Sequence, residues 1–435
     1  MNIAFSKHTL ANGLDVLLHE DPACPIVAVN LWYHVGSKNE TPGHTGFAHL
    51  FEHLMFEGSE HHDRGYFPPL QGAGASLNGS TNADRTNYWE IVPSNALELA
   101  LWMESDRMGF LLPALTDAKF SNQRDVVLNE RRQNYENRPY GLAPMAMLAA
   151  LYPPDHPYHW TTIGEIDDLN AAKIDEVREF FRTYYHPANA SLAVAGDIDA
   201  DKTLDLIRAY FENLEPGPAV LPVRPDEVSL DGETRILLED RVELPRLYIA
   251  WITQAMFAVD DAEMDLAADL LANGKTSRLY RRLVYEERIA TDVSAAQNSR
   301  EVAGFLQLAA TAAPGHTLGE LEHAMIEEVN RLASEGPTDD EMERGRVQAE
   351  AQFVFRLQTV GGFGGKSDQL NAYNTFVGNP DFFDQDLRRY QQVTGASLQA
   401  AVGRYLANTR RIMLSVVPRG RPSLAMPDSI PARVS

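Results

Sequence analysis

The segment from Glu215 to Pro225 divides the chain almost in half. It contains four prolines, which oppose both a helix and a central strand, so it is the strongest linker candidate. The two halves share a faint repeat, because Leu50–Gly58 matches Leu266–Gly274 in its pattern of apolar residues. A repeat at this distance indicates two related domains that arose by duplication.

The length of the chain agrees with this division. A chain of 435 residues with 44% hydrophobic content is more than one compact core usually holds, so at least two globular units are expected. We predict a first domain at 1–214, a linker at 215–228 and a homologous second domain at 229–435.

Charge and cysteine content exclude several classes of function. With 61 acidic and 38 basic residues the formal charge is -23, which repels nucleic acid and anionic membrane surfaces. The one cysteine, Cys24, cannot form an internal disulfide, and a metal site must use histidines and carboxylates. No apolar run of secretory or membrane-spanning length occurs, so we expect a cytoplasmic protein, or a periplasmic one if a signal peptide has been removed.

Strand and helix patterns alternate along the chain, which favours an α/β or α+β fold with more helix than strand. A hairpin is expected over 9–18 because Asn12-Gly13 is a favoured turn. Further strands are predicted at 26–35, 75–80, 86–92 and 191–195, and helices at 47–57, 96–108 and 117–135.

The predicted chemistry lies in the segment His49-Leu-Phe-Glu52-His53. On a helix these three polar residues share one face, while apolar residues occupy the other. Histidines four residues apart project side by side, as two ligands of a tetrahedral zinc must. Glu52 lies between them and could act as the general base on a water. The alternative is an ordinary solvated face of an amphipathic helix, and a zinc site needs a third ligand.

These residues resemble the zinc motif of the pitrilysin/insulinase family of inverted metallopeptidases, including the short bacterial and mitochondrial-processing-peptidase-like members. The resemblance extends over nearly the whole chain. It implies an α+β fold with two homologous domains, each a mixed, mainly antiparallel sheet covered by helices. It also implies that Glu130, in Val126-Val-Leu-Asn-Glu130-Arg-Arg, is the third ligand of one Zn²⁺ per chain. Gln123 stands where many members carry a second glutamate, and could orient a ligand by hydrogen bonding.

The segment Gly74–Thr81 is similar to the family's strand beside the active site. That strand has a free edge to which peptide substrates add as an extra strand. The resemblance therefore implies a substrate-binding strand, and our candidate residues are Ser76, Leu77, Asn78 and Gly79. From composition alone, the segment reads equally well as an ordinary polar hairpin.

The second half departs from the family pattern. Active relatives use an Arg and a Tyr there to bind the substrate backbone and the oxyanion, but this chain has Val284 and Thr291 in those places. Tyr280, Arg281, Arg282 and Tyr285 lie nearby, on a segment expected to be helical. The missing pair suggests a partner: a homologous subunit that supplies Arg and Tyr in a heterodimer, or otherwise a homodimer.

The repeat places acidic and small residues opposite the zinc motif. Asp265, Ala268 and Asp269 correspond to His49, Glu52 and His53, so the second domain is predicted not to bind zinc.

The expected function is thus that of a zinc metalloendopeptidase subunit that cleaves unfolded peptides in a closed chamber. The alternatives are a non-catalytic scaffold or peptide-binding subunit of the same fold, and a metal-dependent hydrolase with non-peptide substrates. Gly361–Gly365 lacks the pattern of a phosphate loop and is expected to be a flexible loop. His61-His62 and Asp155–His159 are given no catalytic role.

Overall fold

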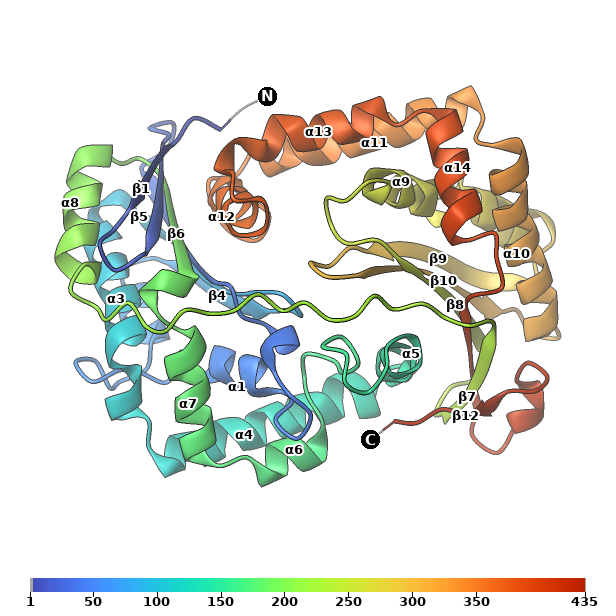
Figure 1. Cartoon of the computed structure of the whole chain (residues 1–435), viewed down its shortest axis with the longest axis horizontal. Coiled ribbons are helices and arrows are strands. Elements are labelled where there is room, and N and C mark those ends of the chain that lie inside the picture. The colour runs from blue at the N-terminus through green and yellow to red at the C-terminus, as the bar shows by residue number, and fades with distance from the viewer. Residues whose placement is uncertain (1–2, 435) are drawn as a thin grey trace. The chain divides into compact units, whose positions relative to one another are not determined.

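The computed structural model describes residues 3–434 and contains two six-stranded sheets (Figure 1). The first sheet consists of β1 Ser6–Thr9, β2 Asp15–Glu20, β3 Ile26–Tyr33, β4 Ser76–Thr81, β5 Thr86–Pro93 and β6 Ala190–Gly196. The second consists of β7 Thr234–Asp240, β8 Arg246–Thr253, β9 Ala290–Asn298, β10 Gly304–Ala312, β11 Ile412–Pro418 and β12 Ile430–Pro431.

The two sheets repeat one topology. The first has the order β1-β2-β6-β3-β5-β4, and the second the order β12-β7-β11-β8-β10-β9. In each sheet one early strand of the half pairs in parallel with one late strand, β2 with β6 and β7 with β11. The pairs that follow toward β4 or β9 are antiparallel. The expected α+β class, with two homologous, mainly antiparallel sheets, is therefore confirmed.

Helices connect and cover the strands. They are α1 Phe47–Leu54, α2 Phe67–Gly72, α3 Leu97–Ala114, α4 Asp117–Arg131, α5 Ala143–Leu151, α6 Ile166–Ala171, α7 Ile174–Tyr184, α8 Ala200–Phe211, α9 Asp261–Ala272, α10 Leu318–Glu335, α11 Asp339–Arg356, α12 Lys366–Val377, α13 Phe383–Gln392 and α14 Gly395–Tyr405. None of the helices described in 3–434 is both long and apolar enough to cross a membrane.

The chain folds into two compact units, each assembled from three stretches of sequence. Unit 1 comprises the residues up to Glu130, Thr161–Val223 and Gln352–Gln385. Unit 2 comprises Arg131–Trp160, Arg224–Ala351 and the residues from Asp386 onward. The division of the chain into 1–214, 215–228 and 229–435 stays a prediction. The compact units differ from it in two segments, because 131–160 belongs to unit 2 and 352–385 belongs to unit 1.

Those two segments each bring a helix to the sheet of the other half. In unit 1, α12 packs on β2, β3 and β6, while α3 and α8 pack on the strands of the same sheet as well (Figure 1). In unit 2, α5 packs on β8 and β11. Each sheet therefore has helices that are remote in sequence from its strands.

The predicted local elements agree with the structure to within a few residues. The hairpin turns at Asn12-Gly13, where Gly13 has a φ of +88°, a left-handed conformation that glycine adopts without strain. The helix expected over 47–57 ends at Leu54. The helix expected over 117–135 continues as α4 only to Arg131, and a wider π-type turn then covers Arg132–Glu136.

Candidate metal centre

The helix that carries the predicted zinc motif is capped by a carboxylate from outside it. Gly46 precedes α1 with a left-handed φ of +87°. The side chain of Glu40 accepts hydrogen bonds from the backbone N–H groups of Gly46 and Ala48, at 3.0 and 2.8 Å. A carboxylate at this position satisfies amides that have no partner within the helix and interacts favourably with the helix dipole. The buried Glu40 therefore stabilises the start of α1, a role that was not predicted from the sequence.

Burial separates the two faces of α1 as the helical wheel predicted. Apolar residues on one face, such as Leu50 and Phe51, have no exposed surface. His49, Glu52 and His53 are only partly buried. The two imidazole rings lie side by side, with their centroids 4.9 Å apart.

Glu130, near the end of α4, brings a carboxylate to the same two histidines. One of its oxygens, Oε2, lies 3.7 Å from Nε2 of His49 and 3.3 Å from Nε2 of His53. Together, one atom from each of the three side chains forms a group within 4.8 Å. The structure thus brings together residues 77 positions apart that only the family resemblance had linked.

The geometry of this group fits a zinc ion. Ligand atoms about 2.1 Å from a tetrahedral zinc lie about 3.4 Å from each other, close to the distances seen here. Burial lowers the pKa of His49 to about 4; the nearby His53 acts in the same direction and Glu130 opposes it. His49 is therefore neutral near pH 7, and its ring can offer a lone pair to a metal.

Glu52, the predicted general base, lies beside the strand predicted to bind substrate. Burial raises the pKa of its carboxyl group, while the Thr81 hydroxyl, His53 and Arg85 act to lower it and Glu130 to raise it. Thr81 is the last residue of β4. Arg85 is held by the backbone oxygen and hydroxyl of Ser80, 2.8 and 2.7 Å from its Nη1, and sequence reasoning did not identify it.

The predicted substrate strand, β4, forms one edge of the first sheet. It pairs with β5 on one side, and no other strand described in 3–434 pairs with it. Of the candidate residues, Ser76 and Asn78 are exposed, Leu77 is half-buried and Gly79 is buried. A Cβ atom at Gly79 would lie 3.1 Å from the rings of Phe56 and Tyr88, so a larger residue here would require these rings to shift. The edge that the resemblance implied is present, and substrate binding to it stays a prediction.

The side-chain amide of Gln123 donates a hydrogen bond to Glu57, which follows the zinc motif. Orientation of a metal ligand by Gln123 stays a prediction.

The corresponding helix of unit 2 has a different polar face. On α9, the hydroxyl group of Tyr390 donates a hydrogen bond of 2.6 Å to Asp265. Burial raises the pKa of Asp265 to about 7, an effect that the Tyr390 hydrogen bond opposes. Ala268 is buried, and Asp269 bonds Asn273 at the end of the same helix. The carboxylates on this face of α9 therefore already have hydrogen-bond partners within unit 2, Tyr390 and Asn273.

The structure also shows the surroundings of the two residues that stand in place of the Arg and Tyr of active relatives. Val284 packs against the core of unit 2, and Thr291 lies exposed on β9. Neighbouring Arg282 is held by three carboxylates, those of Glu287, Glu327 and Glu328. Arg281 is paired with Glu286.

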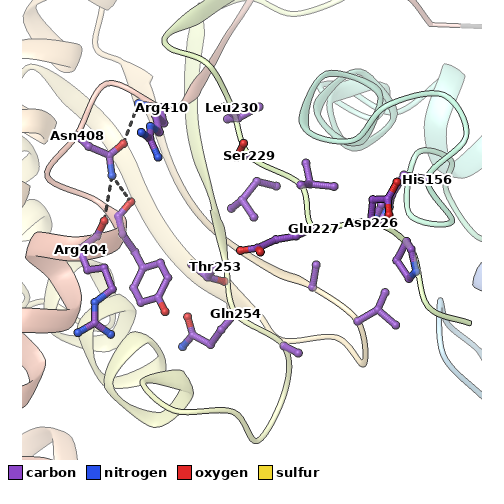
Figure 2. Close-up of a pocket in the computed structure, with 17 residues that line it drawn as sticks. His156, Asp226, Glu227, Ser229, Leu230, Thr253, Gln254, Arg404, Asn408 and Arg410 are labelled. Carbon is purple, nitrogen blue, oxygen red and sulfur yellow. Dashed lines mark hydrogen bonds between the residues drawn. The ribbon is translucent and has the colours of Figure 1, made fainter.

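Unit 2 also contains a cavity of about 510 Å³ (Figure 2). It lies between the segment Pro225–Leu230, the end of β8 and the end of α14, and none of the predicted site residues lines it. His156 lines it but accepts a hydrogen bond on Nδ1 from the backbone of Tyr158, and burial lowers its pKa to about 4. Among residues 3–434, His156 belongs to no group of side chains that could hold a metal ion.

Comparison with known proteins identifies the family. A family model described as insulinase (peptidase family M16) matches residues 15–156, and one described as the peptidase M16 inactive domain matches 171–348. The chain therefore belongs to the pitrilysin/insulinase family, among its short, mitochondrial-processing-peptidase-like members.

Individual relatives agree with this assignment. The zinc protease PqqE of Helicobacter pylori is 26% identical over 94% of this chain and 92% of its own length. The probable mitochondrial-processing peptidase subunit beta of Arabidopsis thaliana is 23% identical over 80% of this chain and 67% of that protein. The crystal structure of a protease from Helicobacter pylori superposes with a TM-score of 0.88, at 24% identity, over 96% of this chain and 100% of that one. The periplasmic protease PqqL of Escherichia coli has a TM-score of 0.79 at 17% identity, over 98% of this chain and 49% of that one.

Proposed function

We propose that the chain is a zinc-dependent endopeptidase subunit that hydrolyses unfolded peptides and oligopeptides. The observation that carries this proposal is the group formed by His49, His53 and Glu130, with Glu52 beside it on the same helix face. Relatives named zinc proteases support zinc as the metal, and one ion per chain would occupy this group.

The residues of the site have distinct roles in this mechanism. An extended peptide would pair with the free edge of β4, so that main-chain hydrogen bonds hold it beside Glu52. Zinc at the His49, His53 and Glu130 group would polarise the scissile carbonyl and acidify the attacking water. Glu52 accepts the proton of that water and then delivers it to the departing amine nitrogen. Burial raises the pKa of the Glu52 carboxyl group toward neutral pH, which suits a group that must both accept and release a proton.

A partner subunit is the second part of the proposal. The side chain of Val284 has no hydrogen-bond donor, and the Thr291 hydroxyl donates to Asp292. Arg281 and Arg282 are paired with carboxylates. A homologous chain that carries the Arg and Tyr pair would complete the site as a heterodimer, and a homodimer is the alternative. The relative from Arabidopsis thaliana is itself named as a subunit.

A non-catalytic scaffold or peptide-binding subunit is the competing function. It is favoured by the match of residues 171–348 to a domain described as inactive. The complete set of metal ligands in unit 1 favours the enzyme instead. The compartment stays a prediction, the cytoplasm, or the periplasm if a signal peptide has been removed; the Escherichia coli neighbour PqqL is described as periplasmic.

The test is hydrolysis of a quenched fluorescent peptide library by the zinc-loaded protein, alone and mixed with a homologous subunit. Replacing Glu52 by Gln keeps the shape of the side chain but removes the base, so the rate should fall about 10²- to 10⁴-fold while bound zinc is unchanged. Glu60→Gln, at an exposed glutamate of the same region, is the matched control.

The outcomes separate the alternatives. Glu52-dependent hydrolysis by the chain alone would establish the peptidase and remove the need for a partner. Zinc binding with hydrolysis only in the mixture would support the heterodimer. A protein that binds no stoichiometric zinc would contradict the proposal and favour the scaffold.

A further inference from the structure

The glycine-rich loop Gly361–Gly365 lies closely against the first sheet, within unit 1. A Cβ atom at Gly361 would lie 2.4 Å from Cβ of Ala28 on β3 and 3.0 Å from Ile91 on β5, so the loop backbone touches the sheet directly. Gly362 and Gly364 have φ angles of +78° and +76°, which favour glycine. The three glycines therefore allow one bulky residue, Phe363, to be presented at a fixed place on this face.

The loop is held by hydrogen bonds to a buried carboxylate. Asp368, in the first turn of α12, accepts a bond of 2.8 Å from the backbone N–H of Gly364. Its other oxygen accepts bonds from Trp32 at 2.9 Å and Asn87 at 3.1 Å, both on strands of the sheet. The backbone N–H of Lys366 also donates to Thr359 across the base of the loop, at 2.9 Å. This loop is thus built into the sheet surface, contrary to the expectation of a flexible one.

Phe363 remains half-exposed in spite of this anchoring. Its ring meets that of Trp89 edge to face, with centroids 5.5 Å apart and an interplanar angle of 87°. Yet 51% of the residue's surface is accessible to solvent. An apolar residue held in place by its loop and left half-open on one side has surface available for a ligand.

The position of this aromatic pair connects it to the edge strand. Trp89 pairs directly with Asn78 of β4, so both side chains point to the same face of the sheet. A peptide added beyond β4 would lie two strand spacings, about 9.5 Å, from β5. On this face β4 presents the exposed Ser76 and Asn78 and the half-buried Ser80, none of which is bulky. A long side chain could therefore reach over β4 to the ring of Phe363.

We propose that Phe363 and Trp89 form a substrate subsite that accepts one large apolar or aromatic side chain of a peptide bound along β4. This inference rests on the proposed peptidase function and adds a preference to it. Because alternate residues of a strand point to opposite faces, the subsite can receive side chains only from peptide residues that point to the Trp89 face of the sheet. Since the cleaved bond fixes the register of the peptide, the preference for a large apolar residue should appear at one position whose side chain points to the Trp89 face of the sheet.

The test compares wild type with Phe363→Ala on two quenched peptide series, in which Leu or Ser is placed at each position in turn. Wild type should prefer Leu at one position by about tenfold, the usual value of a well-filled apolar pocket. Phe363→Ala should lose that preference, so that its ratio of Leu-peptide to Ser-peptide cleavage falls toward one. Phe363→Leu should keep most of the preference, and Phe355→Ala, at an exposed phenylalanine of α11, is the matched control.

Failure of this inference can be told apart from failure of the proposed function. Unchanged Leu preference in Phe363→Ala would overturn the subsite and leave the peptidase intact. If no variant hydrolyses peptide, the affinities of the labelled Leu and Ser peptides for Glu52→Gln, with and without Phe363→Ala, give the answer by fluorescence anisotropy. Equal affinity for both series, or no binding, would overturn the subsite.

Discussion

The helices α1 and α9 occupy equivalent places in two sheets of the same strand order, yet they differ in chemistry. In the chain, α1 follows β3 and α9 follows β8. Each of these strands lies antiparallel to one member of its sheet's parallel pair, β3 to β6 and β8 to β11. On α1, two imidazoles face a carboxylate at 3.3 and 3.7 Å. On α9, Asp265 is bonded to Tyr390 and no histidine is present. The difference teaches that the topology requires a helix here and does not require a metal.

The same physical cause acts on both helices with opposite results. Burial lowers the pKa of His49 to about 4 and raises that of Asp265 to about 7. In each case burial favours the neutral form. A neutral imidazole can bind a metal, whereas a protonated carboxyl group cannot. Burial at this place therefore prepares a metal site only where the residue is histidine.

The largest expected effect tests whether the metal belongs to unit 1 alone. His53→Ala should lower zinc affinity at least about 100-fold, since loss of even an outer partner of a ligand costs about 10- to 100-fold. Asp269→Ala, the matched change on α9, should leave zinc affinity unchanged. Competition with a chromophoric chelator measures both. Equal zinc loss in the two variants would break the comparison.

A smaller effect concerns the dependence of stability on pH. The pKa of Asp265 is about 7 in the folded protein, above its ordinary value of 3.8, so the folded chain holds an extra proton between these values. Stability contributed by this group therefore falls as pH rises from about 4 to 7. Between pH 5 and 8, wild type should lose on the order of 2 kcal/mol that Asp265→Asn does not lose.

Urea denaturation at several pH values checks this expectation, with Asp201→Asn, at an exposed aspartate of α8, as the control. A parallel pH profile for wild type and Asp265→Asn would show that the carboxyl group of α9 is not held in its neutral form.

The smallest effect isolates the hydrogen bond that closes α9. Tyr390→Phe removes the donor to Asp265 and should cost about 1 kcal/mol of unfolding free energy. Tyr285→Phe, at a tyrosine that is 73% exposed, should cost nothing measurable. Hydrogen exchange of the unit 2 amides, measured during thermal or urea unfolding, gives the unfolding free energy of unit 2 in both variants. No difference between them would mean that α9 is closed by packing alone.

The features that could be predicted from the sequence are those that depend on neighbouring residues in the chain. Strands and the turn at Gly13 follow from short-range preferences, and the wheel of α1 separated its buried face from His49, Glu52 and His53. Glu130 lies on another helix, so only the family resemblance linked it to the histidines. Glu40 and Asp368 act on backbone N–H groups of segments that no periodicity connects to them. Their roles depend on tertiary placement, which a single sequence does not reveal.

The placement of α12 has a consequence for how this protein is made. The sheet of unit 1 is complete in strands once Gly196 has been synthesised, but the helix that binds Asn30 and Ser191 through Asn371 arrives some 170 residues later. At the usual speed of a ribosome, about 5–20 residues per second, that face waits roughly ten seconds or longer for its cover. During this interval a polar sheet surface that includes Asn30 and Ser191 must stay unpaired in the nascent chain. The first half is thus committed to a native structure that only the finished polypeptide can complete.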